Sequence, residues 1–109
     1  MNSVMNAYME SESTNQTLSR AFRNIANALD CWSHTDLKRV LRIQELNRAQ
    51  EICFILMASL RGSEDDAFNN AMTRILAKTN SDITKALMDK KVDFSEHVKS
   101  FLWMAESMK

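Results

Sequence analysis

Apolar residues recur at helical spacing along most of the chain. In the first such segment they follow one another at steps of four, three, four and three: Leu18, Phe22, Ile25, Leu29 and Trp32. This spacing places all five on one side of an α-helix, which is expected to face a core. Later segments carry similar stripes, at Leu37, Val40 and Leu41, at Phe68, Ala71, Met72, Ile75 and Leu76, at Ile83, Ala86 and Leu87, and at Phe94, Val98, Phe101, Leu102, Ala105 and Met108.

Ser, Thr, Asn and Asp precede these stripes at residues 13–16, 33–36 and 63–66, and are typical helix N-caps. Ser81 precedes the short stripe at 83–87 in the same way and predicts a separate helix there. We therefore expect an all-α fold, a compact bundle of about five helices. Residues 13–109 are expected to form a single helical domain, preceded at 1–12 by an arm or a short helix.

The middle of the chain, about 36–61, contains no helix breaker, yet its apolar side shifts along its length. It is either one long helix or two segments that meet near Asn47, and we favour one long, largely buried central helix. Its second half, "ICFILMASL" at 52–60, is apolar all round, which is typical of a helix buried on every side. In a homodimer, a second copy of the chain would cover the side of this helix that its own chain leaves exposed; alternatively, the other helices of the same chain surround it.

Composition excludes several classes of enzyme. The chain has one glycine, Gly62, and no proline, so it cannot form the glycine-rich loops of nucleotide-binding enzymes or a nucleophile elbow. Fourteen basic residues balance fourteen acidic ones, and no overall field attracts nucleic acid or an anionic membrane. We expect a protein that is not an enzyme, with no catalytic residues.

Two candidate metal sites fail on spacing. Asp89, Asp93 and Glu96 fit the second half of a calcium loop, but Lys85 and Leu87 occupy its first ligand positions. Asp93 or Ser95 is better read as the cap of the last helix. Zinc could be considered at Cys31, His34, Cys53 and His97, whose spacing matches no zinc signature. We expect no metal and no cofactor.

Methionines and an isolated tryptophan point to protein binding. Met-rich helix faces adapt to partner helices, and Trp103 falls opposite the apolar stripe of its own segment, where it would be exposed. The alternatives are that methionines such as Met57 and Met72 fill the core, and that the N-terminal arm covers Trp103. The predicted partner interface consists of Phe54, Met57, Trp103 and Met104.

A basic patch supports a second function. Two arginines project from the first helix and three basic residues from the next, with only Ser33-His34-Thr35 between the two predicted helices. This arrangement resembles a helix-turn-helix in outline. The residues expected to contact nucleic acid are Arg20, Arg23, Lys38, Arg39 and Arg42.

We therefore expect a small helical regulator that binds another protein through an apolar surface, as a homodimer, in the manner of an adaptor, inhibitor or anti-activator. A nucleic-acid-binding regulator is the alternative. No stretch is apolar enough to span a membrane, and the first residues lack a basic, then apolar, signal pattern. A cytoplasmic location is expected, in the host cell if the protein is of viral or plasmid origin.

Overall fold

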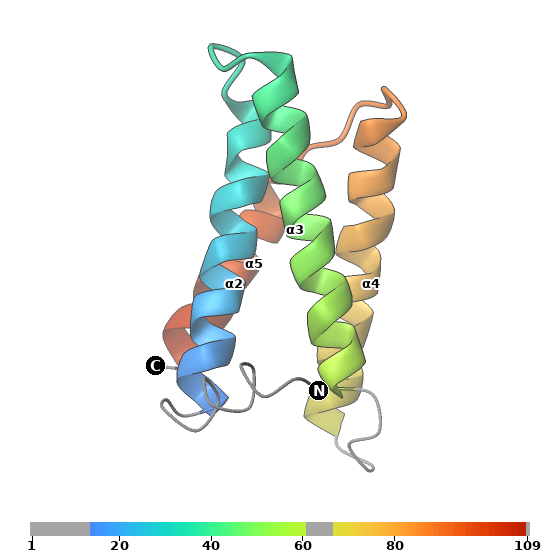
Figure 1. The fold of residues 1–109 in the computed structure, drawn as a ribbon. Coiled ribbons are helices and arrows are strands. Elements are labelled where there is room, and N and C mark those ends of the chain that lie inside the picture. Colours follow the sequence, from blue (N-terminus) through green and yellow to red (C-terminus); the bar gives the residue numbers. More distant parts are fainter. Residues whose placement is uncertain (1–13, 61–66, 109) are drawn as a thin grey trace, which may run out of the picture.

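The computed structural model describes residues 14–60 and 67–108, and these ranges contain helices and no strand (Figure 1). The elements are α2 (Thr14–Asp30), the short 3₁₀ helix η1 (Cys31–Ser33), α3 (Arg39–Leu60), α4 (Ala67–Leu87) and α5 (Ser95–Ser107). The expected all-α bundle is confirmed. The predicted arm at 1–12 lies outside the described residues.

The four α-helices alternate in direction along the bundle (Figure 1). α2 packs against both α3 and α5, and α3 packs against α4. Polar side chains join α4 to α5, where His97 meets Asp82 and Thr79. This is the up-down-up-down arrangement that short connections between neighbouring helices favour.

The core lies where the predicted stripes of α2 and α5 meet. Phe22 and Phe101 are fully buried with ring centroids 6.0 Å apart. The Ser19 hydroxyl donates a hydrogen bond of 2.6 Å to the Ala105 carbonyl oxygen, which fixes the two helices in register. The other large, fully buried side chains are Ile25, Leu29, Leu46, Cys53, Leu76, Thr79 and Ile83.

The described ranges contain four α-helices and the short η1, where about five helices were expected. Residues 83–87 continue α4 and do not form a separate helix behind Ser81. The hydroxyls of Thr79 and Thr84 donate to the carbonyl oxygens of Ile75 and Asn80, one turn earlier. Polar residues that bond back in this way fit inside a helix and do not end it.

One uninterrupted α3 confirms the long central helix, with two corrections. It begins at Arg39, because residues 34–38 form a turn in which the Leu37 amide donates to the His34 carbonyl oxygen. It is also not largely buried: burial is confined to the side formed by Leu46, Ala49, Cys53 and Leu56. The expectation fails because α2 and α4 cover α3 from one side only, and its outer side faces solvent.

The end of α4 is marked by Asp89, whose φ of 63° lies in the left-handed region. The Lys90 amide donates to the Lys85 carbonyl oxygen and the Asp89 amide to that of Ala86, which is the hydrogen-bond pattern of a Schellman cap. The Asp89 carboxylate forms an ion pair with Arg39 at the start of α3. This contact joins the beginning of α3 to the end of α4.

Candidate protein-binding surface

The four residues of the predicted protein interface do not form one surface. Phe54 on α3 is 57% exposed and Trp103 on α5 is 71% exposed, whereas Met104 is buried and Met57 is half-buried against the core. α5 packs chiefly on α2, and α3 chiefly on α4 and α2. Met104 therefore belongs to the core, and Phe54 and Trp103 belong to two separate faces.

Trp103 borders an apolar hollow at one end of the bundle. The hollow has a volume of about 270 Å³, and its walls come from the first turns of α2 and α4 and the last turns of α5. Phe68, which is 46% exposed, contributes a second aromatic ring. The remaining lining residues are Asn15, Met72, Met104, Ser107 and Met108.

Sequence reasoning missed Phe68 because it placed this residue on the core stripe of α4. The helical phase is right, since Met72 and Leu76 one and two turns later are buried. Phe68 lies in the first turn of α4, where the neighbouring helices leave a hollow and cover it only in part. Periodicity identifies the side of a helix but not where along its length the covering ends.

The second apolar face is the outer side of α3. Val40, Leu41, Phe54 and Ile55 are all between 46% and 57% exposed, and Leu37 just before the helix is also exposed. Polar residues separate the two apolar groups in the middle of the helix. A single helix that presents apolar residues on both its inner and its outer side is typical of an interface between proteins.

Two of the residues predicted to contact nucleic acid, Arg39 and Arg42, make contacts with other side chains and the backbone of this chain. Arg42 donates a hydrogen bond of 3.2 Å to the Trp32 carbonyl oxygen, and its guanidinium carbon lies 5.0 Å from the Trp32 ring centroid. Arg39 lies 5.9 Å from the same centroid and pairs with Asp89. Cation–π contacts of this kind fix the turn between α2 and α3 against the indole.

The remaining basic residues do not form a helix-turn-helix surface with these two. Arg23 of α2 pairs with Glu106 of α5 at 3.5 Å. Arg20 and Arg23 both line a hollow that includes none of the other predicted contacts. Lys38 precedes α3, so the connection between α2 and α3 is longer than the three predicted residues. α2 and α3 lie side by side as a hairpin, whereas the helices of a helix-turn-helix cross steeply (Figure 1).

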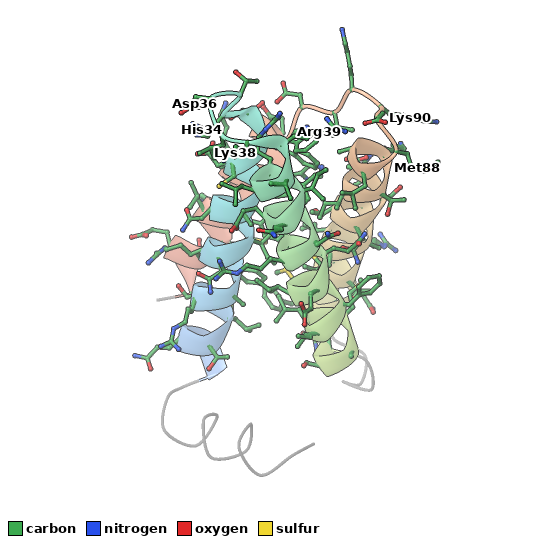
Figure 2. The ribbon with its side chains drawn as sticks, turned by 45° about the horizontal axis from the view of Figure 1, so that its top comes forward. His34, Asp36, Lys38, Arg39, Met88 and Lys90 are labelled. Atoms are coloured by element: carbon green, nitrogen blue, oxygen red, sulfur yellow. The ribbon has the colours of Figure 1, made fainter. Side chains whose placement is uncertain are left out.

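The end of the bundle that carries the α2–α3 turn has charges of both signs (Figure 2). His34, Asp36, Lys38 and Arg39 lie at this turn, and Met88 and Lys90 lie across from them at the end of α4. A hollow of about 570 Å³ between them is lined by Trp32, Arg39, Ala86, Asp89, Lys90, Lys91, Val92 and Asp93. The two carboxylates in its wall weaken any attraction for phosphate.

Asp82, His97 and Thr79 form a polar cluster between α4 and α5. His97 Nε2 lies 2.7 Å from Asp82 Oδ2, and His97 Nδ1 lies 3.3 Å from Thr79 Oγ1. The order carboxylate, imidazole, hydroxyl resembles a catalytic triad. Thr79, however, is fully buried and its hydroxyl donates to Ile75, so no substrate can reach it, and the cluster joins two helices instead.

The candidate metal ligands are dispersed across the bundle. Cys31 lies on η1, Cys53 in the core and His97 between α4 and α5. Among the residues whose placement is described, no three His, Cys, Asp or Glu side chains gather in a way that could hold a metal ion. Asp93 accepts hydrogen bonds from the Ser95 amide at 2.9 Å and its hydroxyl at 2.6 Å. The N-cap of α5, however, is Phe94, with no side-chain cap hydrogen bond, so neither Asp93 nor Ser95 is the cap that was expected.

Comparison with known proteins finds no family model, no characterised protein and no solved structure that matches this chain. Within the described ranges, no helix combines the length and the apolar character needed to cross a membrane. The features that point to a function are therefore the two exposed apolar faces, one around Trp103 and the other on the outer side of α3.

Proposed function

We propose that this chain is a non-enzymatic regulatory protein that binds an apolar helix of another protein and acts as a homodimer. The observation that carries the proposal is the exposure of Trp103, at 71%, beside Phe68 on the rim of an apolar hollow. Exposed tryptophan is rare on surfaces that meet only water and frequent at the centre of protein interfaces.

The shape and composition of the hollow favour a helical ligand. It is bordered by helices on two sides, α4 and α5, and Met72, Met104 and Met108 line it. Thioether side chains adjust to ligands of irregular shape, and a groove of this kind accepts the apolar face of an amphipathic helix. Its small volume fits two or three apolar side chains and not a whole cofactor.

The experiment places a photo-crosslinking amino acid at position 107, where Ser107 lines the hollow, and, as a control, at position 99, where Lys99 is exposed on the same helix. A partner captured from 107 and not from 99 is then purified, and its affinity for the Trp103→Ala and Phe68→Ala variants is measured. We expect Trp103→Ala to weaken binding by about 30-fold, which corresponds to the loss of one interface hot spot.

Stability measurements distinguish an interface anchor from a core residue. Trp103→Ala should change the free energy of unfolding by less than about 0.5 kcal/mol, because the side chain is exposed. Phe101→Ala, two residues earlier and fully buried, should cost about 3–5 kcal/mol. A large loss of stability in the Trp103 variant, or unchanged partner affinity, would contradict the proposal.

Nucleic-acid binding remains the second candidate, favoured by Lys38 and Lys90 at the same end of the bundle (Figure 2). Lys38→Glu with Lys90→Glu tests it better than changes at Arg42, whose contacts with Trp32 stabilise the fold. Retention on DNA that is lost in this double variant, with no captured protein partner, would favour the alternative.

A further inference from the structure

The outer side of α3 has a regular pattern that the apolar groups alone do not reveal. Exposed residues recur at alternating steps of three and four along it: Leu41, Gln44, Arg48, Glu51, Ile55 and Ala58. This is the spacing of the seam along which two helices pack in a coiled coil. The buried side of the same helix faces α2 and α4, so α3 has a second seam against which no helix of the described ranges packs.

We infer that this seam pairs with the same seam of a second copy, in an antiparallel arrangement about a two-fold axis. The inference rests on the homodimer part of the proposed function and specifies the surface. A two-fold interface must be self-complementary, because each patch meets a copy of itself. The seam meets this condition, since apolar residues occupy both ends and one residue of each charge lies in the middle.

The charges select the orientation. In the antiparallel register, Arg48 lies opposite the partner subunit's Glu51, and Glu51 opposite the partner subunit's Arg48. At the two ends, Leu41 lies opposite the partner subunit's Ala58. A parallel pair would instead place Arg48 against a second Arg48 and Glu51 against a second Glu51, and like charges at such positions oppose pairing.

The contacts within the chain leave the central charges available. Arg48 makes only a long contact of 3.8 Å with Glu45, one turn earlier, and Glu51 has no ion-pair partner in the part of the chain that the structure describes. Phe54 and Val40 flank the seam on one side and are each 57% exposed. In the antiparallel register, Phe54 of each copy lies level with the partner subunit's Glu45, and Val40 lies level with the partner subunit's Ser59, so both add apolar area beside the seam.

The pairing leaves the Trp103 hollow accessible, because this hollow involves α2, α4 and α5 and no residue of α3. A dimer of this kind presents two identical hollows and can hold two copies of a partner. Self-association and partner binding are therefore separable by substitution.

The test exchanges the two charges and follows mass by light scattering over a dilution series. The wild-type protein is expected at twice the chain mass of 12.5 kDa. In the Arg48→Glu variant, the centre of the seam carries only acidic side chains; in the Glu51→Arg variant, it carries only basic ones. Like charges then face each other across the two-fold axis, so each variant should dimerise with at least about tenfold lower affinity. An equimolar mixture of the two should associate as well as the wild type, since each acidic centre then meets a basic one.

Lys99→Glu provides the matched control, because it reverses an exposed charge and removes a similarly long contact, 3.9 Å to Glu96, on α5. It should leave the dimer unchanged, and circular dichroism should show all variants folded. A wild-type monomer at every concentration would overturn the inference and the homodimer together, without bearing on partner capture at the Trp103 hollow. A dimer that persists in both single variants would overturn the α3 surface only, and a mixture much tighter than wild type would overturn the antiparallel orientation.

Discussion

His97 on α5 and Asp82 on α4 are joined by a contact of 2.7 Å between Nε2 and Oδ2, and each side chain is less than one-fifth exposed. Lys78 and Lys85 approach the same carboxylate from its own helix, at 3.4 and 3.8 Å. Asp82 thus lies at the centre of a group of basic side chains, of which His97 is the one that reaches another helix.

Replacing His97 by alanine should therefore lower the free energy of unfolding by about 1–3 kcal/mol, the range for a hydrogen bond to a charged group that is shielded from water. Glu96→Ala, at an exposed neighbouring position, serves as the control and should change it by less than about 0.5 kcal/mol. Urea unfolding followed by circular dichroism measures both. Equal effects of the two substitutions would show that the His97 contact adds nothing.

The pH dependence of stability should report Asp82. Burial alone would raise the pKa of this carboxyl, but hydrogen bonds from His97 and Lys78 outweigh it, and the pKa lies below its ordinary value of 3.8. Because the pKa is lower in the folded than in the unfolded state, ionised Asp82 stabilises the fold above pH 3.8, and this contribution is lost as the pH falls through the folded pKa. The stability difference between wild type and Asp82→Asn should shrink between about pH 5 and pH 2. A difference that is equal at both pH values would exclude this linkage.

The two cysteines should react very differently with thiol reagents. Burial raises the pKa of Cys53 to about 12. For Cys31, burial and then the nearby Glu45 and Asp30 carboxylates raise the pKa, but the side chain is partly exposed. At pH 8 we expect Ellman's reagent to modify one thiol per folded chain and the second only after unfolding. The Cys31→Ser variant should show no reaction while folded; rapid modification of that variant would place Cys53 at the surface.

Asn80 is a site at which an apolar substitution should stabilise the protein. The residue is only 7% exposed, and neither its amide nitrogen nor its side-chain oxygen has a hydrogen-bond partner among the described residues. Asn80→Leu keeps the number and branching of the side-chain heavy atoms and removes the two unpaired groups, so the free energy of unfolding should rise by about 1–2 kcal/mol. The control is Asn47→Leu on the exposed side of α3, for which no such gain is expected. A loss of stability in the Asn80 variant would mean that its amide is paired in solution.

Much of the fold could be predicted from local spacing. The stripe of α2 proved to be core, with Phe22, Ile25 and Leu29 fully buried, and α3 proved to be one helix. The error at Ser81 arose because a cap and a mid-helix polar residue look alike in sequence. They differ only in whether neighbouring hydroxyls bond to the preceding turn, as Thr79 and Thr84 do.

The candidate surfaces were harder to predict, because burial depends on how many helices are present to cover a residue. The phase of its helix predicted that Trp103 is exposed. Phase could not show that Met104, the next residue, is buried, or that Phe54 is 57% exposed. For the same reason, the apolar run at 52–60 is predicted to be buried on all sides, although none of the described helices covers its outer side.

The close packing of α2 against α5 also determines when the protein can finish folding during synthesis. Ser19 and the residue whose carbonyl oxygen it bonds, Ala105, are 86 positions apart. At ribosomal rates of 5–20 residues per second, the apolar stripe of α2 waits roughly 4–17 s for the helix that covers it. α2, α3 and α4 can associate as each leaves the ribosome, but Phe22 can be fully enclosed only after α5 has emerged. A nascent chain that stalls before residue 95 would present this stripe to chaperones and proteases.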